Sequence, residues 1–294
     1  MENGKLNTKA MLVSLSISMW RCRRRDKRIT EETAKRYGTV LKAGNYNKNL
    51  LPLEDENGYQ AVVAAAAAAY SHFHEQTLPW LDEGTRICCA SNYLHLAEIM
   101  RRDRAAFERK VAEFKVDLPE LMRKAKAVLG PKLFREDEYP SATSADARFG
   151  FSLRVFPLPS AEDFRVSLTE EDVASIQKQI ELDVQESVSS AMSDVWWRLH
   201  KAVSHFREQV KDGVVRGAML ANLRELCEVL PRLNLAGDPR LDEMRDKVMA
   251  TLGGYEAEDL KKKHGGARRR AAQDAERIQK DLAAFMGNDY GNDG

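Results

Sequence analysis

Hydrophobic and polar residues alternate along a short stretch near the start of the chain. Between residues 13 and 19, apolar residues occupy every odd position and serines occupy the positions between them. A period of two is typical of a β-strand with one covered face. A second alternating stretch, residues 149–155, ends at Pro157 and Pro159, and a weaker third candidate spans residues 85–90. We therefore expect a small antiparallel sheet built from strands that are distant in sequence.

Most of the remaining chain has the three- and four-residue spacing of amphipathic helices. The longest apolar stripe follows Thr169, an N-cap residue with an acidic first turn behind it, and continues to residue 210. A helix of about forty residues exceeds the usual ~11 or 12 and needs a long partner. Shorter helices are expected over residues 30–38, 59–73, 91–115, 119–129, 214–230, 240–251 and 267–286.

The obvious partner for the long helix is the segment 91–129, which predicts an antiparallel, coiled-coil-like helical hairpin. The expected fold class is α+β and mainly α, with this hairpin, the small antiparallel sheet and C-terminal helices. Paired glycines at 253–254 and 265–266 separate the last helix. We expect a mixed domain over residues 1–252, and a basic helix with a disordered tail over residues 253–294.

Composition is that of a folded protein without a membrane segment. Hydrophobic residues make up 43% and charged residues 31% of the 294 positions, a balance typical of globular domains. No apolar run approaches the ~20 residues that cross a bilayer, and the first residues lack a signal-peptide pattern, so a cytoplasmic protein of the host cell is expected. The four cysteines have neither zinc-site nor disulfide spacing and are expected to be buried or idle thiols.

The sequence lacks the local motifs of most enzymes. It contains neither GxxxxGK[ST] nor GxGxxG, the glycine-rich loops that hold nucleotide phosphates. His72 and His74 are two apart on a predicted helix and would point about 200° apart, which disfavours a shared metal. His200 and His205 lack a nearby nucleophile, and dipole complementation already explains two of the acidic groups at 54–56, 136–138 and 170–172. We expect no catalytic residues, no metal and no cofactor.

Positive charge is concentrated directly after the first predicted strand. Residues 21–28 carry six Lys and Arg and a single Asp26, a net charge of +5. This density suits phosphate groups, since each contact releases condensed counterions and arginine can bind a phosphate through two hydrogen bonds. Trp20 is a candidate for stacking on an unpaired base, or alternatively for the core. The candidate nucleic-acid-binding residues are Trp20, Arg21, Arg23, Arg24, Arg25, Lys27 and Arg28.

Other interpretations of the basic run stay open. It can dock to an acidic protein surface, or it can be the solvated end of a strand. Residues 1–50 have a net charge of +8 and residues 51–100 a net charge of −6, so the two blocks can also attract each other within or between subunits. A second basic cluster, residues 261–263 with 268–270, extends the surface only if the fold brings it close.

Several stretches resemble one family of bacteriophage and mobile-element proteins, classed as a domain of unknown function. They are LVSLSISMWRCRRR, LPWLDEGTRI leading into a helix with FERKVAEF, and YPSATSADARFGFSLRVFPLP before a long amphipathic helix. The resemblance covers about residues 8–250. It implies genes that often lie near MoxR-type AAA ATPases, von Willebrand A-type proteins and recombination genes, and it brings no catalytic residues. The chain departs from the family at Cys22-Arg23, where a small residue such as Gly is expected after the tryptophan.

The residues and the resemblance together predict a non-enzymatic phage accessory protein that binds DNA or RNA in phage DNA metabolism. The alternatives are an adaptor or scaffold for an AAA ATPase or a host-defence protein, acting through the helical hairpin and the acidic block, or a structural oligomer. Trp196 and Trp197 are adjacent on a predicted helix and point about 100° apart, so both cannot face one partner. This favours a homo-oligomer.

Overall fold

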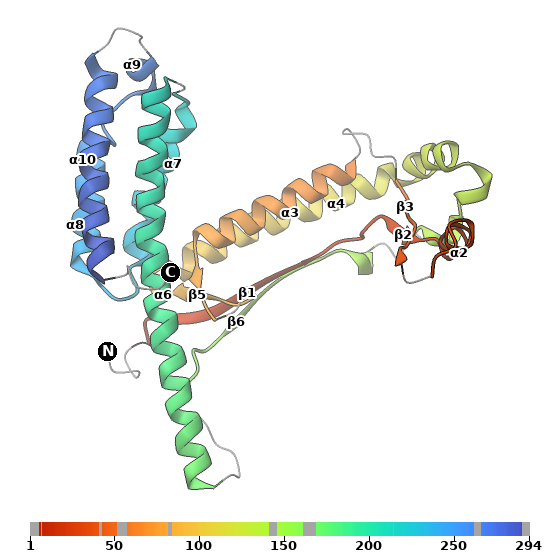
Figure 1. The fold of residues 1–294 in the computed structure, drawn as a ribbon, viewed down its shortest axis with the longest axis horizontal. Helices are drawn as coiled ribbons and strands as arrows, with labels where there is room; N and C mark the ends of the chain where they lie inside the picture. Colours follow the sequence, from red (N-terminus) through yellow and green to blue (C-terminus); the bar gives the residue numbers. More distant parts are fainter. Residues whose placement is uncertain are drawn as a thin grey trace. The chain divides into compact units, whose positions relative to one another are not determined.

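The computed structural model is a mainly helical α+β fold with a small sheet, which confirms the predicted fold class (Figure 1). It describes residues 6, 8–40, 43–51, 58–81, 84–140, 146–160, 169–213, 215–261 and 266–289. The chain divides into two compact units. Unit 1 comprises Met1–Ser14, His74–Leu96 and Arg154–Gly294, and unit 2 comprises Leu15–Phe73 and Ala97–Leu153.

Three predicted strands are present and belong to one sheet. They are β1 (Ala10–Ser18), β5 (Arg86–Cys89) and β6 (Gly150–Phe156), and the short β4 (Leu78–Pro79) joins them in the order β4-β5-β1-β6. β1 and β5 pair antiparallel with Ala10 opposite Cys89, which confirms the predicted assembly from distant strands. A separate two-stranded ribbon, β2 (Arg23–Arg25) with β3 (Asn47–Asn49), was not predicted.

The helices follow the predicted apolar periodicity, but several bounds differ: the helix expected over 214–230 begins at Gly217 and runs through Pro231 to Leu233, and the helix Ala257–Lys261 was not predicted. The helices are α2 (Lys27–Arg36), α3 (Gly58–Glu75), α4 (Ala90–Leu133), α6 (Glu170–Asp212), α7 (Gly217–Leu233), α8 (Pro239–Thr251), α9 (Ala257–Lys261) and α10 (Gly266–Asp289). Single 3-10 turns are η2 (Glu136–Glu138) and η3 (Asp146–Arg148). α2 begins three residues before the expected cap: Asp26 caps it, and Thr30 instead donates its hydroxyl to the Asp26 carbonyl at 2.7 Å.

From Ala90 to Leu129, α4 is one continuous helix where two were expected. It runs through Pro119, which lacks the N–H of a normal helical residue. Phe114 and Leu121, on either side of this proline, are buried in the same hydrophobic cluster, and this shared burial outweighs the missing hydrogen bond. The predicted end at Gly130 is confirmed, because this glycine has a φ of 65° and interrupts the helical backbone before Pro131.

The predicted pairing of 91–129 with the long C-terminal helix is wrong. In unit 2, Phe107 and Phe114 of α4 are buried in one hydrophobic cluster with Val62 and Ala66 of α3. In unit 1, the buried stripe of α6 packs against α10 and α7 (Figure 1). Each long helix therefore has partners within its own unit. Apolar spacing determines that a helix needs a partner but does not identify which helix supplies it.

The C-terminal helix belongs to the core of unit 1. Ala271, Ala275 and Leu282 of α10 are fully buried in the same cluster as Trp196 and Phe206 of α6. The end of the expected disordered tail, residues 290–294, lies outside the described residues. Among the residues that the structure describes, no helix is long and apolar enough to span a membrane.

Candidate nucleic-acid interface

The middle of the basic run forms one strand of the two-stranded ribbon, and Lys27 and Arg28 begin helix α2. Arg23, Arg24 and Arg25 form β2 and all three are exposed. They pair antiparallel with Asn49, Lys48 and Asn47 of β3, respectively. Arg23 Nε also donates to Asn49 Oδ1 at 3.1 Å. Backbone pairing holds the three arginine Cα atoms in an extended row, so their side chains project from a fixed base rather than from a loose strand end.

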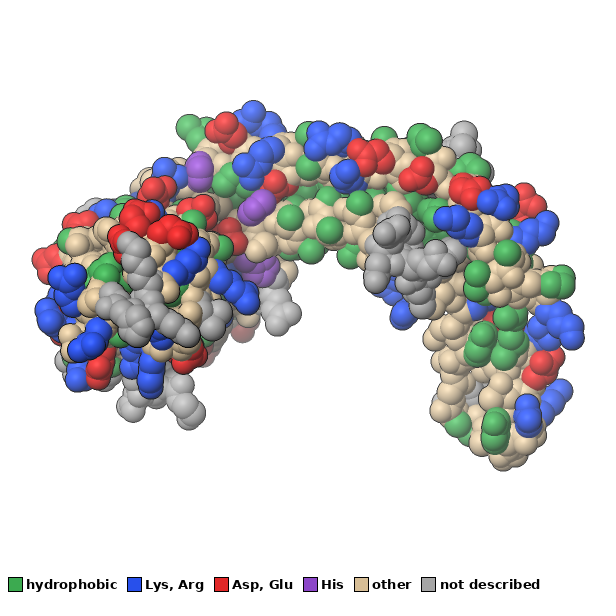
Figure 2. All heavy atoms as spheres, turned by 90° about the horizontal axis from the view of Figure 1, so that it is seen from above, with side chains coloured by type: hydrophobic (Ala, Val, Ile, Leu, Met, Phe, Trp, Pro, Cys, Tyr) green, Lys and Arg blue, Asp and Glu red, His purple; other side chains and the backbone are tan. Residues whose placement is uncertain are grey.

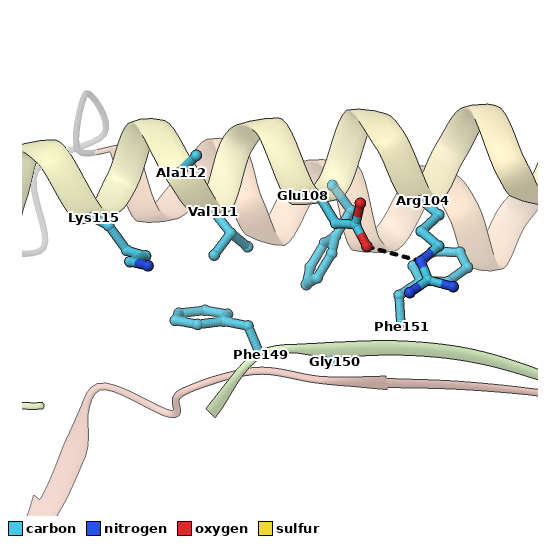
Figure 3. A pocket seen from close by; sticks show the side chains of 9 residues that line it. Arg104, Glu108, Val111, Ala112, Lys115, Phe149, Gly150 and Phe151 are labelled. Carbon is cyan, nitrogen blue, oxygen red and sulfur yellow. Dashed lines mark hydrogen bonds and ion pairs between the residues drawn. The ribbon is translucent and has the colours of Figure 1, made fainter. Parts of the chain in front are cut away.

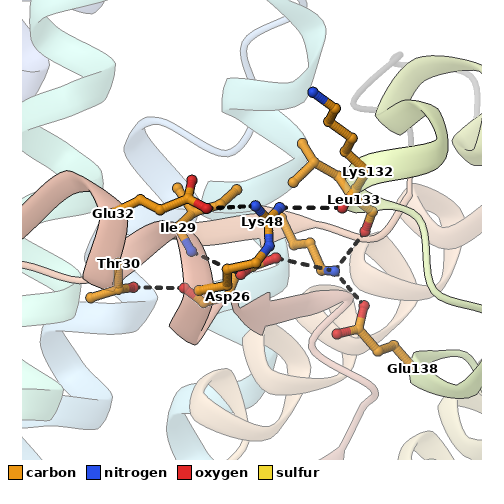
Figure 4. Close-up of polar contacts among 9 residues, drawn as sticks. Asp26, Ile29, Thr30, Glu32, Lys48, Lys132, Leu133 and Glu138 are labelled. Carbon is orange, nitrogen blue, oxygen red and sulfur yellow. Dashed lines mark hydrogen bonds and ion pairs between the residues drawn. The ribbon is translucent and has the colours of Figure 1, made fainter.

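A buried lysine anchors this ribbon to the rest of unit 2 (Figure 4). The Lys48 side chain is 1% exposed, and its Nζ lies 2.6 Å from Glu138 Oε2 and 3.7 Å from Asp26 Oδ2. The same Nζ donates to the Leu133 carbonyl at 2.7 Å. A buried ammonium requires such partners, since an unpaired charge in the interior is strongly unfavourable.

Asp26 links the ribbon to helix α2. Its Oδ1 accepts a hydrogen bond from the Ile29 N–H at 3.1 Å, and its own N–H donates to the Tyr46 carbonyl at 2.9 Å. The Ile29 hydrogen bond, with Lys48 and Arg28 nearby, lowers the pKa of this carboxyl below its ordinary value of 3.8. Within α2, Arg28 pairs with Glu32 at 2.8 Å. The acids at 54–56 in the expected acidic block lie outside the described residues.

The turn before the ribbon has an unusual backbone. Cys22 has a φ of 52°, a left-handed conformation that glycine adopts without steric cost. This is the position where the family resemblance leads us to expect a small residue. Its carbonyl accepts the Leu50 N–H at 2.8 Å, so the turn brings the chain into line with the segment that follows β3.

Trp20 is a core residue of unit 2. Its side chain is 5% exposed, and its ring lies 6.4 Å from that of Phe114 and 6.1 Å from that of Tyr139, measured between centroids. Its carbonyl accepts the hydroxyl of Tyr59. The sequence allowed either a core position or a base-stacking position for Trp20. The structure places Trp20 in the core, so its ring is not available for stacking on a base.

Four arginines surround a pocket of about 300 Å³ beside the ribbon. All four are exposed, and among the described residues none of them has a carboxylate within ion-pair distance. The one acidic group in the lining, Glu138, is already neutralised by Lys48. The lining comprises Met19, Trp20, Arg21, Arg23, Arg24, Leu50, Glu138 and Arg148. The result is a cationic hollow with an apolar floor.

Arg148 is the member of this site that the sequence did not reveal. It stands in η3, just before strand β6, and lies far along the chain from the basic run. No local pattern distinguishes it from any other exposed arginine. Only the position of β6 beside β1 brings the end of η3 to the start of the basic run.

A second pocket, of about 270 Å³, lies between α4 and β6 (Figure 3). Phe149 and Phe151 form its strand side, and Phe107 and Val111 form its helix side. Arg104, Glu108 and Lys115 stand at the rim, where Arg104 Nε pairs with Glu108 Oε1 at 2.8 Å. Both pockets lie within unit 2.

The charges on α4 differ from those on the ribbon. Figure 2 shows basic and acidic side chains next to one another along this helix. They form pairs within single turns, such as Lys110 with Glu113 and Arg123 with Glu120, each at 2.6 Å. Such pairs neutralise each other locally. These pairs contrast with the three arginines of β2, which have no carboxylate partner among the described residues.

Two of the remaining candidate histidines have structural partners. His72 Nδ1 lies 2.7 Å from Asp103 Oδ2, and His205 shares a hydrogen bond with Gln209 at 2.8 Å. The described residues contain no group of three or more potential metal ligands. Arg268 of the second basic cluster donates to the last carbonyls of α6 in unit 1, and residues 262–263 lie outside the described residues. The four cysteines are buried free thiols, as predicted.

The fold and the site define a mainly helical α+β protein with an exposed arginine ribbon. Neither the family models nor the curated proteins nor the solved structures contain a match to this chain.

Proposed function

We propose that this protein binds nucleic acid through the arginine ribbon and the pocket beside it. The observation that carries the proposal is the set of exposed arginines, Arg21, Arg23, Arg24, Arg25 and Arg148, without carboxylate partners among the described residues. Guanidinium groups without an internal carboxylate partner are available to phosphates, and each contact releases counterions. The role is that of a non-enzymatic accessory factor, in the phage or mobile-element setting that the family resemblance implies.

The way the ribbon is built supports this function. Lys48 faces inward and satisfies Glu138 and Asp26, while its neighbours across the ribbon face solvent. Glu138, the acidic residue that lines the pocket, is thus paired with Lys48 from within the fold. A fixed β backbone also reduces the conformational entropy that the arginines lose on binding.

The test is a fluorescence-anisotropy titration of the full chain with labelled DNA and RNA oligonucleotides over a series of salt concentrations. Replacing Arg23, Arg24 and Arg25 together with Ala should weaken binding at least tenfold at low salt. The slope of log K against log salt should also fall by roughly 2–3, since each phosphate that the protein neutralises contributes about 0.7–0.9.

The matched control removes the same charge from α4. Arg101, Arg109 and Arg123 are exposed on that helix, and their combined replacement with Ala should leave most of the affinity and the slope unchanged. The proposal is overturned if the unmodified chain binds no oligonucleotide at low salt, or if both triple variants lose the same affinity.

A second candidate function is self-association through the start of α6. Val173 and Ile176 are partly exposed, and among the described residues they lie outside the core cluster that Ile180 joins further along the helix. An apolar stripe that continues beyond the core suits a second copy of the same helix. In Figure 1 the first turns of α6 extend beyond the other helices of unit 1.

Light scattering coupled to size-exclusion chromatography tests this second function. The unmodified chain should elute as a dimer or larger species, and Val173→Glu with Ile176→Glu should give the monomer. Replacing the exposed Glu181 and Glu186 with Gln on the same helix is the control. A monomeric unmodified chain would contradict self-association. Nuclease-resistant recovery of an AAA ATPase or host protein would then favour the adaptor role.

A further inference from the structure

We propose that the pocket between α4 and β6 receives one unpaired base, so that the site prefers single-stranded nucleic acid. This inference rests on the proposed function, because it assumes that the arginine ribbon holds the phosphate backbone. It assigns to Phe149 and Phe151 the base-stacking role for which Trp20 was the candidate in the sequence.

The two phenylalanines lie on one face of the chain at the start of β6. Residues two apart in a strand point to the same side of the sheet, and Figure 3 shows the rings of Phe149 and Phe151 turned toward α4. Each ring is held by a core neighbour: Phe149 by Phe114, with centroids 5.9 Å apart, and Phe151 by Phe107, with centroids 6.0 Å apart. Both side chains stay partly exposed, so ring surface remains for a ligand.

The size and polarity of the pocket fit a flat heterocycle. Its volume is about 270 Å³. That space suits a single base rather than a helix or a strand of a partner protein. Its walls are aromatic and aliphatic, and its rim carries Arg104, Glu108 and Lys115. A base has a π-face for the rings and polar edges for the rim.

Two adjacent residues of the chain line the cationic pocket and the aromatic pocket, respectively. Arg148 lines the cationic pocket, and Phe149, the next residue, lines the aromatic pocket. Their Cα atoms are therefore about 3.8 Å apart. One stretch of nucleic acid can then contact Arg148 through a phosphate and Phe149 through a neighbouring base. In a duplex the base is paired and stacked, and moving it into a pocket costs a few kcal/mol.

The experiment compares three ligands of matched length on the unmodified full chain: a single-stranded DNA, the same backbone with abasic sites, and a duplex. The abasic strand keeps every phosphate. Stacking is worth about 1–3 kcal/mol per base, so it should bind roughly 5- to 150-fold more weakly than the intact strand. The duplex should also bind more weakly at equal salt.

A protein-side comparison uses Phe149→Leu and Phe151→Leu, with Phe134→Leu as the control. Phe134 packs against Tyr139 elsewhere in unit 2. The first two variants should bind intact and abasic DNA with similar affinity. They should also fail to quench the fluorescence of a strand that carries 2-aminopurine, which the unmodified protein quenches. Phe134→Leu should keep both.

The outcomes separate the inference from the function on which it rests. Equal affinity for the intact and abasic strands overturns the base-binding pocket and leaves the phosphate-binding ribbon in place. Failure of all three ligands to bind at low salt overturns the proposed function itself. The ligand comparison needs no protein variant, so misfolding of a phenylalanine variant does not prevent a decision.

Discussion

Lys48 and Glu138 form a buried ion pair, with 2.6 Å between Nζ and Oε2, that joins strand β3 to the turn after α4. The lysine side chain is 1% exposed and the glutamate side chain 13%. This pair, together with Asp26, is what fixes the inner strand of the arginine ribbon. The position of the exposed arginines thus depends on Lys48, a buried residue of the same charge.

Replacing Lys48 with Ala should destabilise unit 2 strongly. The change removes the counter-charge of Glu138 and one of the positive charges near Asp26, and leaving a largely buried carboxylate unpaired costs about 3–5 kcal/mol. Urea unfolding followed by tryptophan fluorescence measures the loss, since Trp20 lies in the same unit. The double variant Lys48→Met with Glu138→Gln removes both charges and should lose much less. A loss below about 1 kcal/mol for Lys48→Ala would contradict the role given to this pair.

Asp26 should make the stability of the ribbon depend on acid pH. The Ile29 hydrogen bond lowers the folded-state pKa of Asp26 below 3.8, so its charged form stabilises the fold. This contribution is fully present above pH 3.8 and is lost as the pH falls through the lowered folded-state value. Asn is a good N-cap, so Asp26→Asn isolates the charge. The variant should be about 1–2 kcal/mol less stable at pH 7.

The measurement is urea unfolding of both proteins over a series of pH values. The difference in unfolding free energy should shrink as the solution becomes more acidic and should vanish once Asp26 is protonated in the folded protein. A difference that stays constant with pH would show that the carboxylate charge has no part in it.

Local periodicity predicted the helices and strands of this fold better than it predicted which of them pack against each other. The alternation from residue 13 and the long stripe after Thr169 gave β1 and α6, because an element buries one face whatever covers that face. The partner is a property of the whole chain. α3 shares a buried cluster with α4, and α10 shares one with α6.

Only the part of the site that is contiguous in sequence could be predicted. A run of arginines is visible in sequence, but its folding as β2 is not, because Arg23–Arg25 has no apolar alternation and its partner Asn47–Asn49 is polar as well. Trp20 closes the alternating strand, and sequence alone allowed both a core and a surface position. Arg148 and Phe149 join the site through the sheet, a relationship that no local pattern encodes.

Arg148→Ala should weaken nucleic-acid binding as much as Arg24→Ala does. Both side chains line the cationic pocket, and removing one phosphate-binding arginine should lower the salt slope by about 1. Arg154→Ala is the control, since Arg154 is exposed on β6 but does not line that pocket. Anisotropy titrations over a salt series give the slopes. An unchanged slope for Arg148→Ala would remove this residue from the interface.

The four thiols should be inert in the folded protein. Burial raises the pKa of Cys22, Cys88 and Cys89 to about 12 and that of Cys227 to about 11. The reactive thiolate is therefore scarce at pH 8, and the side chains are shielded as well. Ellman's reagent should report close to no reactive thiol in the native protein and all four in denaturant. Fast reaction of one or more native thiols would contradict the buried positions.

Gly213 and Arg268 should contribute to the end of α6 as a coupled pair. Gly213 has a φ of 77° and ends the helix, while Arg268 of α10 donates to the carbonyls of Val210 and Lys211, each at 2.7 Å. A Cβ at position 213 would meet the guanidinium at 2.6 Å. Gly213→Ala therefore strains the backbone by about 1–2 kcal/mol and also displaces Arg268 from the carbonyls it caps.

A double-mutant cycle on urea unfolding measures this coupling. Since Gly213→Ala already displaces the guanidinium, adding Arg268→Ala should cost less than Arg268→Ala costs alone, and the two losses should not add. Arg269→Ala, at an exposed position on the same helix, should cost little and should add independently. Strict additivity of the Gly213 and Arg268 variants would mean that Arg268 keeps its carbonyl contacts when a methyl group is present, and the proposed coupling would be wrong.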